Sequence, residues 1–492
     1  MSGVAPPQAR ELRPYQSHAI EMLRESLRGG KRRPVLQAPT GYGKTVLAGA
    51  IIRMALEKGR RVIFTAPAID LIDQTVESFR ADGIEGIGVL QADHPLTDPE
   101  QPVQICSVQT LQNREIPPAG LVIIDECHRA YKFVHEWMAR PDWQKVPFIG
   151  LSATPWTKNL GLYFDDLVIS ATTAELIESG YLSPFRVFAA SHPDLTGVKI
   201  VGGDYHEGQL SDAMNQADLN GDVVGTWLRL AEGRPTLVFG VDCAHAQSLR
   251  DAFRAAGVNA GYQDAATPKD ERERIKRRFH SGVNPVVCNV GTLTTGVDWD
   301  VRCISLVRPT KSEMLYVQIV GRGLRTAPGK EDCLILDHSD TTLRLGFVTD
   351  ILHDKLDDGT KKKPGEPPPE WETTDGELKK RVIEQDTAVE LVELVVGAGV
   401  KRGGQGRIEV GGEEMSLPQF AAALRGYAAE RGYKPGWAAH KYKEAVGAWP
   451  PFGSAEAEPP EGVRRWIRER QIAWRRGYAS RAPSAAAPPQ AS

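Results

Sequence analysis

The sequence contains few cysteines and no pattern that would use them. Six of its 492 residues are cysteines, and no two of them form a C-x-x-C pair. Neither a disulfide framework nor a zinc ribbon is therefore indicated, and we expect most of these side chains to be buried, reduced thiols. They are Cys106, Cys127, Cys243, Cys288, Cys303 and Cys333.

Long apolar runs and an excess of one charge are also missing. No apolar stretch approaches the roughly 18 residues that a membrane span needs, and the start, MSGVAPPQAR, lacks the charged beginning and apolar centre of a signal peptide. The sequence therefore predicts a soluble, cytoplasmic protein. The net charge of -3 does not indicate nucleic-acid binding, but it leaves room for a local basic groove.

What is present is the composition of a long globular chain. Hydrophobic residues make up 41% and charged residues 25%, which excludes wholesale disorder and collagen-like or coiled-coil classes. At about 150 residues per domain, the length predicts roughly three folding units.

Short apolar runs alternate with helical patterns over about residues 36–337. The runs include VLQAP, VIFTAP, LVIIDE, TLVFG and CLILD, and they are typical of buried strands in parallel sheets. This alternation predicts a doubly wound α/β architecture. A less regular stretch at about residues 189–220 separates two clusters of strands, so we expect two sheets.

We place the division between the two sheets near Ser183. The first α/β domain would cover residues 1–182 and the second residues 183–350. Residues 351–376 contain a Lys run and a Pro run typical of a linker. A small, mainly helical accessory domain at residues 377–481 and a disordered Pro/Ala/Ser tail at residues 482–492 complete the prediction.

The segment APTGYGKT, residues 38–45, lies between a predicted strand and a predicted helix, as a phosphate-binding loop requires. Gly41 and Gly43 let the backbone amides point inward, Lys44 can reach the β and γ phosphates, and Thr45 offers a hydroxyl to Mg²⁺. Ala38 replaces the usual first glycine, and a chance turn is the alternative. The predicted loop contacts are Thr40, Gly41, Gly43, Lys44 and Thr45.

Two adjacent acids follow the buried strand LVII at residues 121–124. The carboxyl edge of such a sheet is where α/β proteins bind their ligands. Asp125 can hold Mg²⁺ while Glu126 orients and deprotonates an attacking water. The alternative is that both residues only cap the next helix.

With D-E-C-H at residues 125–128, the chain resembles a superfamily 2 helicase of the DExH type. Further family motifs follow in order over about residues 10–345. The resemblance implies two tandem RecA-like domains with ATP and Mg²⁺ in the cleft between them. It also implies that Gln16, in LRPYQ, hydrogen-bonds the adenine, with support from Arg13 or Tyr15.

The resemblance assigns the remaining motifs to strand contact and to coupling. TAP at residues 65–67 and SVQT at residues 107–110 match positions that touch a nucleic-acid strand, and SAT at residues 152–154 matches the coupling motif. GTLTTGVD at residues 291–298 would contact both strand and nucleotide, the latter through Gly296 and Asp298. The implied strand contacts are Pro67, Gln74, Ser107, Gln109, Thr110 and Thr292.

QIVGRGLR, residues 318–325, resembles the family's arginine-finger motif. An arginine from a neighbouring domain can accelerate phosphoryl transfer by about 10³ to 10⁵. Arg322 and Arg325 are the candidates, and Gln318 and His128 would bridge the two domains by hydrogen bonds. A core or helix-capping role for His128 is the alternative.

The helical pattern of residues 463–478, VRRWIRERQIAWRRGY, mixes arginines with tryptophans. Val463, Trp466, Ile467 and Trp474 share one face, and much of the rest is Arg464, Arg465, Arg468, Arg475 and Arg476. The pattern fits a helix that grips phosphates and stacks on bases. It fits equally a small helical core with a solvated arginine face, or a surface that docks a replication, repair or restriction partner.

The leading hypothesis is an ATP-dependent motor that moves on DNA and separates its strands. DNA is favoured over RNA because LRPYQ, APAIDL and QIVGRGLR resemble DNA repair, restriction and phage-type helicases more than DEAD-box RNA helicases. The alternatives are a translocase that moves on duplex without unwinding, an RNA helicase, and a nucleic-acid-binding scaffold with an inactive motor.

Overall fold

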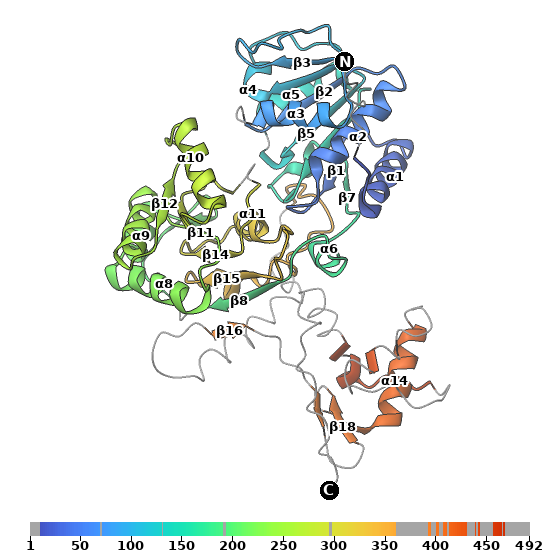
Figure 1. The fold of residues 1–492 in the computed structure, drawn as a ribbon. Coiled ribbons are helices and arrows are strands. Elements are labelled where there is room, and N and C mark those ends of the chain that lie inside the picture. Colours follow the sequence, from blue (N-terminus) through green and yellow to red (C-terminus); the bar gives the residue numbers. More distant parts are fainter. Residues whose placement is uncertain are drawn as a thin grey trace, which may run out of the picture. The chain divides into compact units, whose positions relative to one another are not determined.

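The computed structural model describes residues 10–360 without residues 69–70, 130, 190–192 and 295–297 (Figure 1). It also describes residues 392–394, 400–402, 407–410, 413–430, 438, 441–442, 456–464 and 466–467. The chain divides into two compact units, Met1–Glu393 and Leu394–Ser492. The first unit contains both large sheets.

The first sheet has seven strands in the order β3-β4-β2-β5-β6-β1-β7. Every neighbouring pair is parallel. Its strands are β1 (Pro34–Gln37), β2 (Val62–Ala66), β3 (Ile87–Leu90), β4 (Val103–Ser107), β5 (Leu121–Asp125), β6 (Phe148–Ser152) and β7 (Asp166–Val168). The helices are α1 (Pro14–Arg28), α2 (Lys44–Leu56), α3 (Ile72–Ala81), α4 (Val108–Leu111), α5 (Lys132–Ala139) and α6 (Thr173–Glu178).

Both faces of this sheet are covered by helices. Ile63 and Phe148 pack in one apolar cluster with Trp137 of α5. Phe64, the next residue along β2, points the other way, because successive side chains of a strand alternate between faces. Its ring packs edge-on against Phe79 of α3, with the ring centroids 5.2 Å apart. A parallel sheet buried on both faces explains why its strands are continuous apolar runs.

The second sheet has the order β12-β13-β11-β14-β15-β8-β16. Its strands are β8 (Phe185–Ala189), β11 (Thr236–Phe239), β12 (Ala260–Gln263), β13 (Val286–Asn289), β14 (Cys303–Leu306), β15 (Cys333–Asp337) and β16 (Val392–Leu394). The helices are α7 (Glu207–Met214), α8 (Ala217–Leu230), α9 (Cys243–Ala255), α10 (Lys269–His280), α11 (Glu313–Gly323) and α12 (Thr341–Leu345). From β12 to β8, neighbouring strands pair in parallel.

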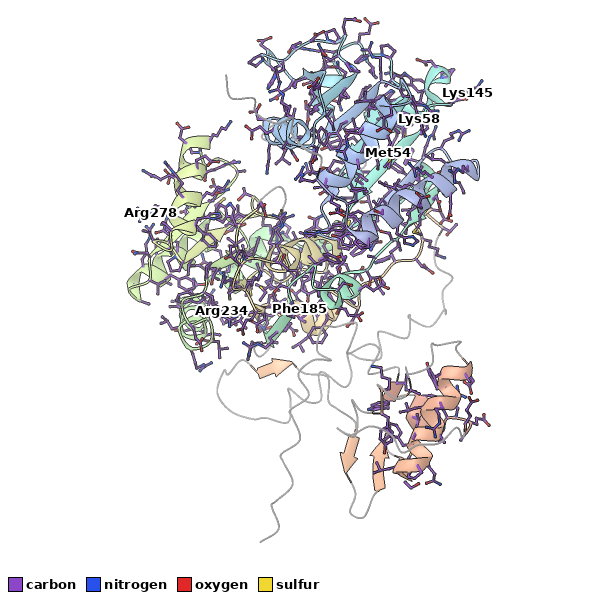
Figure 2. All side chains as sticks on the ribbon, turned by 45° about the vertical axis from the view of Figure 1, so that its right-hand side comes forward. Met54, Lys58, Lys145, Phe185, Arg234 and Arg278 are labelled. Carbon is purple, nitrogen blue, oxygen red and sulfur yellow. The ribbon has the colours of Figure 1, made fainter. Side chains whose placement is uncertain are left out.

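Side chains pack against both faces of this sheet as well. Val238 and Leu336 form one cluster with Trp227 of α8 and Phe253 of α9. On the opposite face Gly323 of α11 approaches Ile304. On β8, next to the edge strand β16, the ring of Phe185 (labelled in Figure 2) packs near Phe347, with the ring centroids 6.2 Å apart. The predicted fold class, two doubly wound parallel-sheet domains, is confirmed.

The irregular stretch before α7 contains a short hairpin of β9 (Ile200–Val201) and β10 (Asp204–Tyr205). Asp204 fixes it to the second domain, because its carboxylate accepts a hydrogen bond from Thr310 Oγ1 at 2.7 Å. Residues 351–360, where we expected a linker to begin, instead lie against the first domain. Asp357 Oδ1 accepts from the Asn159 amide at 2.9 Å.

The second unit contains strands as well as the expected helix. β17 (Val400–Arg402), β18 (Arg407–Val410) and β19 (Glu413–Ser416) form an antiparallel sheet before α14 (Leu417–Glu430). Trp466 and Ile467 are buried against Phe420 in its core. We call residues 463–478, which mix arginines with tryptophans, the Arg/Trp helix. The observed role of its described part is therefore packing in this core. Arg465, Arg468, Trp474, Arg475 and Arg476 lie outside the described residues.

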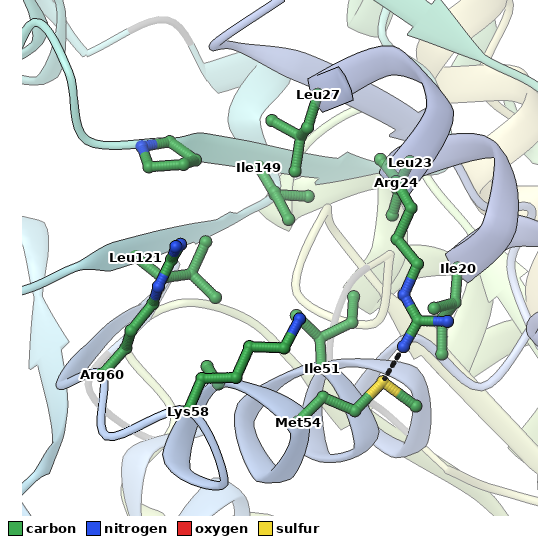
Figure 3. Close-up of a pocket in the computed structure, with 12 residues that line it drawn as sticks. Ile20, Leu23, Arg24, Leu27, Ile51, Met54, Lys58, Arg60, Leu121 and Ile149 are labelled. Carbon is green, nitrogen blue, oxygen red and sulfur yellow. Dashed lines mark hydrogen bonds between the residues drawn. The ribbon is translucent and has the colours of Figure 1, made fainter. Parts of the chain in front are cut away.

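Five of the six cysteines are buried and Cys243 is exposed, all as free thiols, which confirms that expectation. Among the helices of the described segments, none is long and apolar enough to cross a membrane. A small cavity of about 110 Å³ lies between α1 and α2, where mostly apolar side chains meet Arg24, Lys58 and Arg60 (Figure 3). Arg24 donates to the Met54 sulfur there at 3.2 Å.

Candidate functional site

The loop between β1 and α2 is shaped by two glycines in the left-handed region. Gly41 has φ +86° and Gly43 has φ +87°, and α2 begins directly after Gly43, at Lys44. A Cβ on Gly43 would lie 2.6 Å from Gln16 Nε2, so a larger residue would have to displace the Gln16 side chain as well as adopt a φ that favours glycine. The loop therefore presents the amino end of a helix and its backbone amides, the arrangement that favours anions.

Lys44 meets the two acids at the end of β5. Its Nζ lies 2.5 Å from Glu126 Oε1 and 3.9 Å from Asp125 Oδ1. Glu126 itself has φ +48°, which is uncommon for a residue other than glycine and turns its carboxylate toward the loop. The chain thus brings the predicted loop lysine and both predicted acids together.

Burial acts differently on the two carboxylates. It raises the pKa of Asp125 to about 6, only partly opposed by Lys44. Burial would also raise the pKa of Glu126, but Lys44 and His128 outweigh it and hold that pKa below its usual range. Glu126 is consequently ionised, and Asp125 lacks enough positive charge around it.

Thr45 and Asp125 line the same cavity, and their oxygens are the ligands that Mg²⁺ prefers. A cation bound there would oppose the effect of burial, which raises the pKa of Asp125. The residues therefore fit a magnesium ion held between the phosphate loop and β5.

Two arginines reach this cavity from α11 and the residues after it. Arg322 is 7% exposed, and burial, together with the nearby Arg325, lowers the pKa of its guanidinium to about 9. Arg325 Nη1 donates to Asp298 at 2.6 Å. All three side chains line the cavity of about 440 Å³ that also contains the phosphate loop.

Close packing holds α11 against the phosphate loop. A Cβ on Gly321 would lie 2.6 Å from the Cβ of Thr40, so only glycine allows this approach. Gln318, one turn earlier, donates to Thr154 Oγ1 at 3.0 Å, and its Nε2 lies 3.3 Å from His128 Nε2. The structure therefore brings Gln318 and His128, the two predicted bridging residues, next to each other.

His128 continues this connection to the acid. Its Nδ1 lies 2.8 Å from Ser152 Oγ and 3.2 Å from Glu126 Oε2. A continuous path of side chains therefore links Gln318 in the second domain to Glu126 in the first.

Two family models match the chain. Residues 9–157 match "Type III restriction enzyme, res subunit", and residues 221–327 match "Helicase conserved C-terminal domain". The chain belongs to superfamily 2 of the helicases.

Similar proteins include phage, yeast and bacterial relatives. A 51.5 kDa protein of Lactococcus phage (isolate 7-9) is 32% identical over 301 residues, 59% of this chain and 62% of the relative. The IRC3 protein of Saccharomyces cerevisiae is 32% identical over 353 residues, 66% of this chain and 51% of the relative. The EcoAI type I restriction endonuclease subunit of Escherichia coli is 27% identical over 426 residues, which are 76% of this chain and 52% of the relative.

The chain therefore covers half to three fifths of the length of these relatives. A solved fragment of an HsdR subunit of a type I restriction enzyme from Vibrio vulnificus YJ016 has the same fold. Its TM-score is 0.55 at 22% identity, and the match covers 72% of this chain and 70% of the fragment.

Gln16, the predicted adenine contact, is almost fully buried beside the phosphate loop. Its Nε2 donates to the Tyr42 carbonyl at 3.0 Å, and its Oε1 accepts from the Arg13 amide at 2.9 Å. Arg13 Nη1 in turn donates to the Tyr15 hydroxyl at 3.0 Å. The described contacts of Gln16 thus support the loop, and its contact with a base stays a prediction.

The predicted contacts with a nucleic-acid strand are spread over the ends of several β-strands. Pro67 and Gln74 line the cavity that contains the phosphate loop. Ser107 is buried, and its hydroxyl accepts from the Thr110 amide at 3.1 Å and so caps α4. Gln109 on α4 is exposed, and Thr292 follows β13 in the second domain. Gly296 lies outside the described residues.

Sequence reasoning missed three residues at this cavity: Tyr181, Leu182 and Gly321. Tyr181 lines the cavity, and Leu182 packs against Gly41. The segment GYLSP carries no catalytic residue type, and its proximity to the phosphate loop arises only from the packing of the two domains. For Gly321, the only available signal was that it is the first glycine of QIVGRGLR, since a glycine within a helix can mark a close approach of another segment.

Proposed function

We propose that this chain is a nucleic-acid-dependent ATPase that hydrolyses ATP to move along DNA and to separate its strands. The observation that carries the proposal is the cavity in which Lys44 and Glu126 of one domain face Arg322 and Arg325 of the other. Positive charge from two domains around one phosphate-binding loop suits a reaction whose transition state spreads negative charge over the γ phosphate.

In the proposed reaction, water attacks the γ phosphorus and ADP leaves. The γ phosphate competes with Glu126 for Lys44, and the loss of that partner raises the pKa of Glu126. Its carboxylate can then accept the proton of the attacking water. Arg322 and Arg325 stabilise the developing charge, and Gln318 and His128 hold the two domains in register. Magnesium, held by Thr45 and Asp125, would neutralise phosphate charge.

Coupling to movement follows from the placement of these groups. The arginines contribute only while α11 packs against the phosphate loop, as Gly321 and Thr40 do here. Hydrolysis and product release would loosen this contact, so the two domains would alternate between closed and open arrangements on a bound strand.

DNA is the proposed track, and relatives named as restriction enzymes favour it. The same relatives make movement on duplex without strand separation the second candidate. An RNA track and a scaffold with an inactive motor are the remaining alternatives, and the presence of Lys44, Glu126 and Arg325 argues against an inactive motor.

The test is ATP hydrolysis measured in parallel with single-stranded DNA, duplex DNA, forked DNA and RNA. Stimulation by DNA, together with strand displacement from the fork, is the expected result. Stimulation by duplex without displacement would favour the translocase, and the absence of hydrolysis with every nucleic acid would overturn the motor.

A further inference from the structure

Tyr181, Leu182 and Ser183 lie in the connection from the first domain to the second. They follow α6, which ends at Glu178, and precede β8, which begins at Phe185. Each of the three contacts a different part of the candidate site. We call residues 181–183 the hinge segment.

Tyr181 places an aromatic ring at the cavity. The ring is partly exposed and lines the cavity together with Arg13. The Arg13 guanidinium carbon lies 5.1 Å from its centroid, and the edge-on Tyr15 ring lies 5.0 Å from it. A flat ring with an arginine above it is a surface on which a nucleotide base can stack.

Leu182 touches the phosphate loop. A Cβ on Gly41 would lie 2.7 Å from Leu182 Cδ2 and 3.5 Å from Arg325 Cγ. The hinge segment and Arg325 therefore both pack against the same point of the loop.

The backbone of the hinge segment is bonded to the arginine motif. Leu182 forms an antiparallel bridge with Arg325. The Ser183 amide donates to the Leu324 carbonyl at 2.7 Å. Any displacement of the hinge segment consequently moves the backbone from which Arg325 extends.

We propose that the hinge segment senses the nucleotide base and positions Arg325. Tyr181 stacks on the purine of the bound nucleotide, and Arg13 lies beside the same base. The backbone bridge from Leu182 to Arg325 then couples binding of the base to the position of Arg325 at the γ-phosphate end of the cavity. The proposal rests on the ATPase function proposed above. Tyr181 is thus a base contact, and Leu182 and Ser183 are positioning residues.

The test compares ligands with and without a base. Tyr181→Ala and Tyr181→Phe are measured for ATP hydrolysis and, by calorimetry, for binding of ADP and of inorganic tripolyphosphate. Tyr181→Ala should weaken ADP binding about tenfold and leave tripolyphosphate binding unchanged, whereas Tyr181→Phe should match the wild type. Tyr262→Ala is the matched control, because Tyr262 also carries an arginine on its face, Arg250 at 5.7 Å, but does not line the cavity.

A double-variant cycle tests the link to Arg325. If the hinge segment positions Arg325, Tyr181→Ala should lower kcat severalfold in the wild type but not further in Arg325→Ala. Additive losses would overturn the positioning role. Equal weakening of ADP and tripolyphosphate, or unchanged ADP binding, would overturn the base contact. Because ADP binding needs no turnover, a chain that binds ADP but hydrolyses no ATP would refute the ATPase and not the base contact.

Discussion

Lys44 Nζ and Glu126 Oε1 form a 2.5 Å ion pair at the meeting point of the phosphate loop and β5. Each side chain is about four fifths buried or more, so the pair interacts with little screening by water. The group that would bind the γ phosphate is therefore also the group that sets the basicity of Glu126.

Replacing Lys44 by Ala should abolish most ATP turnover. The change removes the ammonium group that faces the phosphates, and removal of one such electrostatic interaction typically costs about 10² to 10³ in kcat. Steady-state hydrolysis and DNA binding, measured side by side, check this, with strand affinity largely retained. Lys58→Ala, just after the end of α2, is the control, since Lys58 is exposed and lies at the small, mostly apolar cavity between α1 and α2. Normal turnover in Lys44→Ala would refute the assignment of residues 38–45 as the phosphate-binding loop.

Replacing Glu126 by Gln should separate ATP binding from hydrolysis. Glutamine keeps the shape of the side chain but cannot accept a proton from water, so kcat should fall about 10² to 10⁴-fold with little change in ATP affinity. Single-turnover hydrolysis and nucleotide binding by calorimetry check the two halves of this prediction. A wild-type rate would exclude Glu126 as the general base.

Replacing Gly321 by Ala should impair hydrolysis without harming the fold of either domain. In an isolated helix, alanine is favoured over glycine by about 1 kcal/mol, but here its Cβ would meet the Cβ of Thr40 at 2.6 Å. We expect a severalfold lower kcat and an unchanged melting temperature. Gly225→Ala in α8, where a Cβ would meet nothing within 4 Å, is the control and should be stabilising or neutral. Equal behaviour of the two variants would show that α11 need not pack against the loop.

The sequence was informative where chemistry and local structure coincide. Lys44, Asp125 and Glu126 each lie within a motif that also specifies its own strand and turn, so both their identity and their position could be predicted. The second-domain arginines depended on a resemblance, because an isolated arginine has no local signature. Their convergence on the cavity is a property of domain packing.

What could not be predicted depends on contacts between residues distant in the chain. No sequence pattern around Leu182 or Gly321 predicts that Gly41 or Thr40 will lie opposite. Trp466 was ambiguous for another reason: a base-stacking helix and a core helix both place tryptophan on one face. Only the burial of Trp466 against Phe420 distinguishes them.

Replacing Gln318 by Ala should weaken the coupling between nucleic acid and hydrolysis. The amide is shared between Thr154 and His128, the residue that leads to Glu126. We expect basal hydrolysis to change by no more than about threefold, while its stimulation by DNA falls about tenfold. An effect of this size matches the loss of one or two hydrogen bonds between the domains. The rate of ATP hydrolysis, measured against DNA concentration, checks this. Full stimulation in the variant would show that the contacts of Gln318 do not couple DNA binding to hydrolysis.

Removing residues 395–492 should weaken nucleic-acid binding if the second unit binds the strand. The cut keeps β16 at the edge of the second sheet. For every DNA phosphate that the unit neutralises, its removal should reduce the slope of log affinity against log salt by about 0.9 on duplex DNA. The described part of the Arg/Trp helix supplies core packing and one surface pair, Arg464 with Glu430 at 2.7 Å, so the phosphates would be bound by other residues of the unit. Titrations at several salt concentrations measure the slope. An unchanged slope with unchanged hydrolysis would identify the unit as a docking surface for a protein partner instead.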